Sequence, residues 1–275
     1  MEDVRTLATG LDHPEGIALG PDSLLYAGGE AGQVYRVDPT NGGTQQIAAS
    51  EGGYMLGLCL DAAGAVYICD AGIAAVLRVD PSGALERWCE AADGTRLTCP
   101  NWPAFGLDGA LYVSDSGPED PRVAAGRIIR VPPGGGDATA LELPPLYFPN
   151  GLALAADGTL VFLESFRPRL LQVHGSGLQV IAELPGTVPD GVAVDDEGGY
   201  VVSCYYPYHL YRVPPGGGAP ELLLHDATGT QFPMPTNVCF FGDGLATLAV
   251  SSLGGCTLSA VEIGRRGLPL SYPTI

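Results

Sequence analysis

Positively charged residues are scarce in this chain. Its 275 residues include 13 lysines and arginines against 31 aspartates and glutamates, which gives a formal net charge of −18. Nucleic acids and anionic membrane surfaces are bound by clusters of Lys and Arg that neutralise phosphates. The charge balance therefore argues against both kinds of partner, and its simplest consequence is solubility.

Long apolar segments are also missing. No run approaches the ~18 apolar residues of a transmembrane helix. The chain opens with Met-Glu-Asp-Val-Arg rather than with a charged and then apolar leader. The seven cysteines are odd in number, and none forms a Cys-x-x-Cys pair. We therefore expect reduced, buried thiols and a cytoplasmic protein, with a monomer as the default state.

Several catalytic signatures are absent. The sequence has no Gly-x-Ser-x-Gly elbow, no Walker loop and no His-Glu-x-x-His motif. These absences remove the support for a serine hydrolase of the α/β type, a P-loop nucleotidase or a zinc peptidase. The four histidines are scattered. His13 and His209 lie nearest the motifs described below, and we expect a surface or structural role for each.

No stretch shows sustained helical periodicity, and six similar stretches occur instead. Each combines a short apolar run, a Gly-bearing turn such as Asp157-Gly158, and a β-branched or aromatic run, which together indicate a hairpin. Equivalent positions recur every 40 to 49 residues, a period typical of four-stranded propeller blades. The six stretches are 13–29, 54–72, 99–117, 148–165, 188–205 and 234–252.

Two further strands complete each unit. Third strands are predicted at 33–39, 76–81, 127–133, 210–215 and 256–263, and fourth strands at 84–90, 138–144, 178–184 and 219–225. The sixth unit has no good fourth strand, whereas an extra strand at 3–9 precedes the first unit. If that strand completes the last blade, the ring closes without an open edge. We predict an all-β, six-bladed propeller of four-stranded antiparallel blades, forming one domain over residues 1–275.

One position of the repeat carries residues that packing does not require. It lies eight residues before each Gly-bearing turn, where the first strand of a blade starts at the channel mouth. Four of its six occupants bear oxygen ligands suited to Ca²⁺ or Mg²⁺, and none is His, which weighs against zinc. Asn and Asp before Gly are also common turn formers, but Glu before Gly is not. The six anchor positions are Glu15, Leu56, Asn101, Asn150, Asp190 and Thr236.

A second ring is expected fourteen residues further on, where the second strand returns to the same face. Its carboxylates could support the first ring or handle protons, and the alternative is that they cap turns. The positions are Gly29, Asp70, Asp115, Glu164, Cys204 and Val250.

The motifs His-Pro-Glu-Gly (13–16), Phe-Pro-Asn-Gly (148–151) and Pro-Asp-Gly (189–191) carry a resemblance. In order and phase, they resemble the senescence marker protein 30/gluconolactonase family of six-bladed propellers. The resemblance implies a divalent cation, typically Ca²⁺, held by Glu15, Asn150 and Asp190, with Mg²⁺, Mn²⁺ or Zn²⁺ as alternatives. It also implies that Asn101 contacts substrate or completes the metal shell.

One departure from the family bears on the substrate. Lactonases of the family often carry Arg two residues before the Asn of the third repeat, and here that position is Cys99, with Arg96 out of register. Trp102 and the tyrosines of residues 205–208 point to a more apolar pocket than a sugar lactone needs. The predicted substrate-binding residues are Asn101, Cys99, Trp102, Asp115, Glu119 and Tyr205.

These features predict a metal-dependent hydrolase of a small ester or lactone. The metal would polarise the carbonyl and activate a water, and Asp190 would accept its proton as general base. One alternative is a non-hydrolytic enzyme, such as one that condenses, cyclises or isomerises a natural-product intermediate at the same site. Another is a non-enzymatic interaction propeller with a structural ion.

Overall fold

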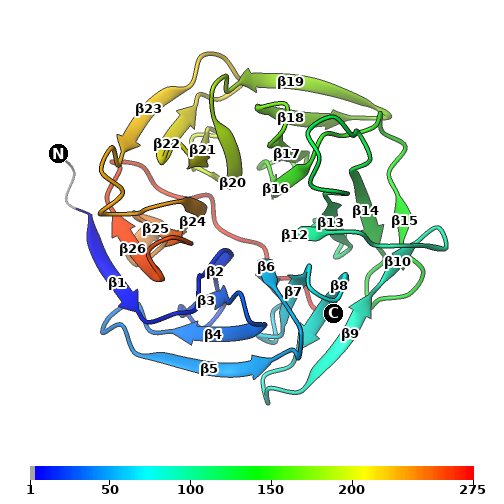
Figure 1. Cartoon of the computed structure of the whole chain (residues 1–275), viewed down its shortest axis with the longest axis horizontal. Helices are drawn as coiled ribbons and strands as arrows, with labels where there is room; N and C mark the ends of the chain where they lie inside the picture. The colour runs from blue at the N-terminus through cyan, green and yellow to red at the C-terminus, as the bar shows by residue number, and fades with distance from the viewer. Residues whose placement is uncertain (1–3) are drawn as a thin grey trace.

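The computed structural model describes residues 4–275 and shows six antiparallel sheets arranged in a ring (Figure 1). Among these residues the only helix is a three-residue 3-10 turn, Asp243–Leu245, so none is long and apolar enough to cross a membrane. The all-β, six-bladed prediction is therefore confirmed.

Each blade has four strands, and the first lies innermost (Figure 1). The first three blades contain β2 (Ile17–Leu19), β3 (Leu25–Gly28), β4 (Gln33–Val37) and β5 (Thr44–Ala49); β6 (Met55–Leu60), β7 (Val66–Asp70), β8 (Ala75–Val79) and β9 (Leu85–Cys89); and β12 (Pro100–Phe105), β13 (Leu111–Asp115), β14 (Arg127–Val131) and β15 (Thr139–Ala140). The last three contain β16 (Pro149–Leu154), β17 (Leu160–Glu164), β18 (Arg169–His174) and β19 (Gly177–Glu183); β20 (Val188–Val194), β21 (Tyr200–Tyr206), β22 (His209–Val213) and β23 (Glu221–His225); and β24 (Pro235–Phe241), β25 (Thr247–Ser252), β26 (Thr257–Val261) and β1 (Arg5–Thr9).

The ring closes as the sequence predicts. Strand β1 pairs antiparallel with β26, placing Thr9 opposite Thr257. The first strand of the chain is thus the outermost strand of the last blade, which leaves no unpaired edge at the seam. Of the predicted segment 3–9, residue 3 lies outside the described residues.

Two local features differ from the expected pattern. The strand predicted at 138–144 shrinks to Thr139–Ala140, and Pro144 and Pro145 at its end have no N–H to donate to a ladder. An additional hairpin pairs β10 (Ala91–Ala92) with β11 (Thr95–Arg96) around Asp93-Gly94. Asp-Gly is the hairpin signal used for the blades, so the sequence contained the clue to this hairpin.

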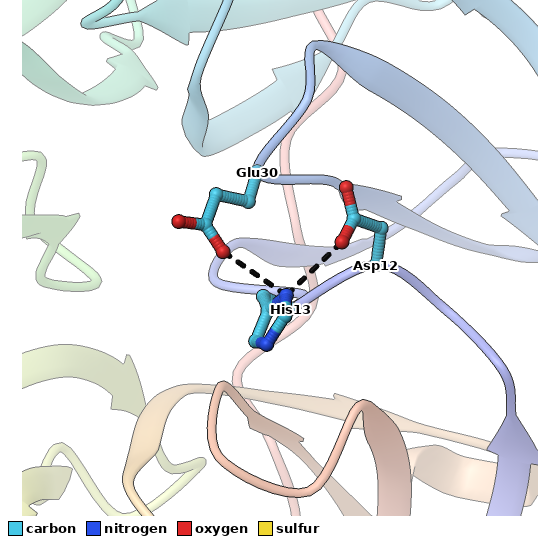
Figure 2. A group of neighbouring side chains, drawn as sticks. All are labelled: Asp12, His13 and Glu30. Atoms are coloured by element: carbon cyan, nitrogen blue, oxygen red, sulfur yellow. Dashed lines mark hydrogen bonds and ion pairs between the residues drawn. The ribbon is translucent and has the colours of Figure 1, made fainter.

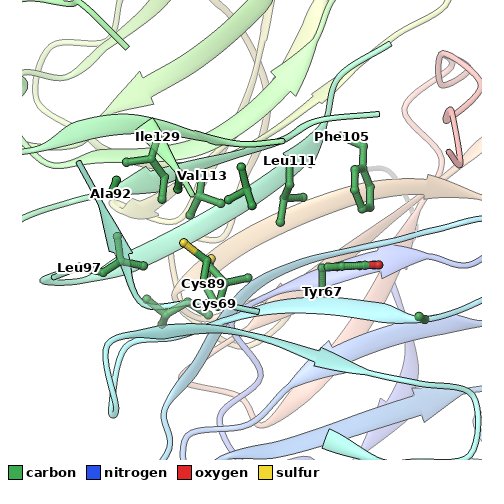
Figure 3. Packing of buried hydrophobic residues seen from close by; sticks show 14 residues of the cluster. Tyr67, Cys69, Cys89, Ala92, Leu97, Phe105, Leu111, Val113 and Ile129 are labelled. Atoms are coloured by element: carbon green, nitrogen blue, oxygen red, sulfur yellow. The ribbon is translucent and has the colours of Figure 1, made fainter. Parts of the chain in front are cut away.

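The core lies between the faces of neighbouring blades. In the interface between the second and third blades, the Tyr67 ring meets Phe105 edge to face at 5.0 Å, with Val113 and Ile129 fully buried beside it (Figure 3). All seven cysteines are free thiols. Cys69, Cys89, Cys204 and Cys239 are buried, as expected, and the other three are half-buried.

Candidate metal centre

The anchor residues lie where the innermost strands begin. Asn101, Asn150 and Asp190 are the second or third residues of β12, β16 and β20, and Glu15 lies two residues before β2. Burial and the charge of Glu15 both raise the pKa of Asp190 well above its usual value, which shows that the two carboxylates share one environment. The Asn150 side chain acts in the opposite direction and lowers the pKa of Asp190, so it also lies near this carboxylate. Residues that are far apart in sequence therefore meet at the channel mouth.

The glycines that follow these anchors serve close packing rather than turns. Gly151 and Gly191 lie inside strands and have no positive φ. A Cβ on Gly151 would lie 2.5 Å from the Asp190 carbonyl oxygen, and one on Gly16 would overlap the Leu56 carbonyl. The alternative that these dipeptides form turns is thus ruled out, because glycine here lets the backbone of the next blade approach.

Two oxygens at this mouth are buried and have no hydrogen-bond partner: Asn150 Oδ1 and Asp190 Oδ1. The Asn150 amide is oriented from its other end, because Nδ2 donates to Ser165 Oγ at 3.1 Å. Buried polar atoms are nearly always paired, since an unpaired one costs about 1–3 kcal/mol. Two such unpaired oxygens at one channel mouth therefore indicate a cation as their partner.

Among the described residues, no positively charged side chain compensates for the carboxylates of Glu15 and Asp190. Burial raises the pKa of Glu15 to about 7; a weak hydrogen bond from Tyr54 Oη (3.4 Å) opposes this, and the charge of Glu30 reinforces it. Of the 13 basic residues, none contributes to the pKa of Glu15 or of Asp190. Two carboxylates, an amide oxygen and no cation form a donor set that fits a hard divalent ion such as Ca²⁺.

The backbone at the mouth is strained. His13 and Phe148 each precede the proline before an anchor, and they have φ values of 42° and 57°. A residue before proline, and a non-glycine residue in general, disfavours this left-handed region. The strain is supported locally, because Ser251 Oγ and Thr236 Oγ1 both donate to the Glu15 carbonyl, at 2.6 and 2.8 Å. Such strain clusters at functional sites.

The carboxylates of the second ring have a different task. Asp115 accepts hydrogen bonds from the backbone amides of Thr98 and Cys99 (2.9 and 2.8 Å) and pairs with Arg127 at 3.0 Å. Asp70 and Glu164 likewise accept from the amides of Tyr54 and Tyr147. All three carboxylates fasten the segment that enters the first strand of their own blade. This is the turn-capping alternative, and it does not support the prediction that Asp115 binds substrate.

The other predicted substrate-binding residues differ in burial. Asn101 and Trp102 are buried, Cys99 and Tyr205 are half-buried, and Glu119 is exposed. Burial raises the pKa of Tyr205, with added contributions from the charges of Asp190 and Glu15. Burial also raises the pKa of Cys99 to about 12, with Asp115, Glu15 and Glu119 adding to it. The charge of Glu15 contributes to the pKa of both Tyr205 and Cys99, which indicates that both residues lie around the mouth.

Sequence reasoning missed Tyr54 and Glu30. Tyr54 occupies the position two residues before an anchor that His13, Cys99 and Phe148 also occupy, so the repeat contained this clue. Glu30 joins a rim cluster in which His13 Nδ1 lies 3.0 Å from both Asp12 Oδ1 and Glu30 Oε2 (Figure 2). The cluster is largely exposed, and its two carboxylates outnumber its one imidazole.

His209 is not part of the mouth. Its Nδ1 lies 2.8 Å from Tyr211 Oη, and its ring meets His225 edge to face at 4.3 Å, across β22 and β23. The expectation of a structural role for His209 agrees with these contacts.

The chain belongs to the SMP-30/Gluconolactonase/LRE-like region family, whose profile matches residues 13–254. Three solved propellers share its fold. A gluconolactonase from Xanthomonas campestris, XC5397, is 23% identical, with a TM-score of 0.77 over 94% of this chain and 89% of the other. Regucalcin, a calcium-binding protein from Agrobacterium tumefaciens, is 17% identical, with a TM-score of 0.78 over 100% and 98%.

The third is virginiamycin B lyase from Staphylococcus aureus, which is 14% identical, with a TM-score of 0.70 over 95% of this chain and 99% of the other. A search of curated protein sequences gave no significant match. At these identities the structural likeness establishes the fold alone.

Proposed function

We propose that this protein is a divalent-metal-dependent hydrolase of small esters, in particular lactones. The observation that carries the proposal is the pair of partnerless buried oxygens, Asn150 Oδ1 and Asp190 Oδ1, near the Glu15 carboxylate, which has no cationic partner among the described residues. Membership of the family, together with gluconolactonase and regucalcin as neighbours, supports a lactonase-like enzyme acting on a small molecule.

Glu15, Asn150 and Asp190 would hold the cation, which we propose to be Ca²⁺. When bound, it would supply Lewis-acid polarisation of the substrate carbonyl. The Asp190 carboxylate would accept a proton from the attacking water, whose oxygen bonds to the acyl carbon. The acyl–oxygen bond then breaks, and the proton passes to the leaving alkoxide, giving a hydroxy acid from a lactone.

The protein side chains at the mouth favour a substrate of low charge. Cys99 replaces the arginine used for polar sugar lactones, and the nearby Arg127 is engaged by Asp115 at 3.0 Å. Asn101 would hydrogen-bond the carbonyl group, and Tyr205 would offer a half-buried aromatic surface at the rim. We therefore propose an ester or lactone with an apolar substituent.

The test is hydrolysis of a lactone and ester panel by the wild type, with and without a chelator, and by Asp190→Asn. Asp157→Asn is a matched control because Asp157 lies in an exposed hairpin turn. We expect turnover to require added Ca²⁺, to fall at least ~100-fold in Asp190→Asn and to be unchanged in Asp157→Asn. Full turnover by Asp190→Asn with an intact fold would refute the assignment.

A non-hydrolytic reaction at the same site is the second candidate, and the shared fold of virginiamycin B lyase favours it. Reaction in H₂¹⁸O separates the two candidates, because hydrolysis places the label in the product and elimination or rearrangement does not. A non-enzymatic propeller would instead bind the ion and turn over no member of the panel.

A further inference from the structure

An apolar cavity of the described chain lies away from the carboxylates. Its volume is about 290 Å³, and all six innermost strands line it. The lining begins past the anchors, with residues such as Ile17, Trp102 and Val192, and continues to the far ends of the strands at Leu60 and Phe105. The channel thus has a polar mouth at the strand starts and a separate apolar chamber toward the strand ends.

Trp102 lies at the boundary of the two regions. Its side chain lines the chamber, whereas the preceding Asn101 belongs to the ring of anchors. Any Cβ on Gly57 would overlap the Trp102 ring, so glycine on the neighbouring blade makes room for the indole. None of Glu15, Asn150 and Asp190 lines the chamber.

The chain's C-terminal segment covers the far end. This strap, residues 267–273, crosses the centre of the ring (Figure 1). It is fastened at one side by Leu268 N donating to Val194 O (2.9 Å), and at the other by Tyr272 Oη donating to Leu19 O (2.8 Å) and Ala62 N donating to Pro273 O (2.9 Å). Between these points the strap makes no backbone hydrogen bond to the described blades, and Leu270 is 51% exposed.

The lining determines which occupant can bind. Within residues 4–275, no charged side chain lines the chamber, and the Tyr272 hydroxyl already donates to the Leu19 carbonyl. Burial raises the pKa of the Cys239 thiol, one of two that line the chamber, to about 12, so this thiol is neutral and behaves as a small apolar group. A metal ion or an anion finds no partner here, and ordered water would need about two to four polar groups.

We propose that this chamber is a binding site for a small, uncharged, apolar molecule of about the size of a two-ring aromatic, enclosed by the C-terminal strap. An apolar cavity of about 150 Å³ holds benzene, and this one is about twice as large. The site is distinct from the metal centre, and its ligand need not be the substrate of the proposed hydrolase.

The test uses the full-length protein and 1-aminonaphthalene, an uncharged probe whose emission rises in apolar surroundings. We expect saturable binding with one site, and at least tenfold weaker binding by Ala104→Phe, which fills the chamber. Ala219→Phe, at an exposed position outside it, is the matched control and should bind as the wild type does. The anion 1-naphthalenesulfonate has the same ring system and should not bind.

A melting curve for each variant verifies the fold, and Leu154→Trp provides a second filling variant if Ala104→Phe does not fold. Removal of residues 268–275 should speed dissociation of the probe at least tenfold. The proposal is overturned if the wild type shows no saturable binding, if a folded filling variant binds as tightly as the wild type, or if the anion binds equally well. Unchanged dissociation after the truncation would overturn the enclosing role of the strap.

Discussion

Ser165 orients Asn150. Its Oγ accepts a hydrogen bond from Asn150 Nδ2 at 3.1 Å and donates one to the Pro189 carbonyl at 2.7 Å, immediately before Asp190. One buried hydroxyl thus joins the fourth blade to the fifth and orients the Asn150 amide. The free Asn150 Oδ1 is a consequence of this arrangement.

Ser165→Ala should therefore weaken metal binding about tenfold or more, because residues that orient metal ligands contribute about 10–100-fold to affinity. The measurement is a Ca²⁺ titration followed by calorimetry. Ser116→Ala is a matched control, because Ser116 Oγ donates to the Pro149 carbonyl at 2.7 Å in the equivalent way but does not touch the Asn150 side chain. Both variants should lose about 1 kcal/mol of stability. Equal Ca²⁺ affinity of the two would show that Ser165 has only a packing role.

The stability of the metal-free protein should fall as pH rises. Burial holds the pKa of Glu15 at about 7, above its usual 4.5, so the folded state binds this proton more tightly than the unfolded state. The contribution is fully present below about pH 4.5 and is lost as pH rises through about 7. Its size is at most about 3 kcal/mol, and solvent at the channel mouth reduces it.

Added Ca²⁺ should reverse this trend, because the ion binds the ionised carboxylates and competes with their protons. The rise in Tm on adding Ca²⁺ should be small at pH 5 and large at pH 8. Glu15→Gln should flatten the pH dependence of the metal-free protein and reduce the Ca²⁺ effect. A Ca²⁺-induced shift that is the same at both pH values would contradict this account.

The repeat made the fold predictable. A hairpin signal in each unit, together with the missing fourth strand of the last unit, was enough to place all six blades and the pairing of β1 with β26. Residues equivalent in the repeat must lie equivalently in the ring, so Glu15, Asn150 and Asp190 could be brought together from sequence alone. Polar contacts between blades, such as that of Ser165 with the Pro189 carbonyl, could not be predicted, because they depend on side-chain direction.

The sequence also could not show the role of the glycines that follow the anchor residues. Asn150-Gly151 and Asp190-Gly191 match turn dipeptides, and only the structure shows that both lie in strands. The chamber depends on how large and small side chains meet across six strands, as Trp102 and Gly57 do, and no periodic pattern records such contacts. The packing of neighbouring blades against one another determines both the role of these glycines and the shape of the chamber.

Gly151→Ala tests the close approach at the metal centre. Its new Cβ would lie 2.5 Å from the Asp190 carbonyl oxygen, a backbone atom that cannot move without shifting β20. We expect about 1–3 kcal/mol lower stability in urea unfolding and a loss of Ca²⁺ affinity, because Asp190 moves with its strand. Gly177→Ala is the control, since its Cβ would meet only the His174 carbonyl oxygen at 3.5 Å. Wild-type Ca²⁺ affinity in a folded Gly151→Ala protein would contradict the proposed geometry.

Asp115→Ala separates the second ring from the first. The substitution leaves Arg127, whose side chain is 21% exposed, without its carboxylate and frees the amides of Thr98 and Cys99. Removing one member of such a pair costs about 3–5 kcal/mol, so the urea midpoint should fall sharply. Ca²⁺ affinity, measured well below the melting temperature, should remain within about threefold of the wild type, because Asp115 is committed to the chain entering β12 rather than to the ion. A large loss of Ca²⁺ affinity in Asp115→Ala protein that is still folded would instead assign Asp115 to the metal centre. Restored stability in the double variant Asp115→Ala/Arg127→Leu would confirm that the unpaired guanidinium causes the destabilisation.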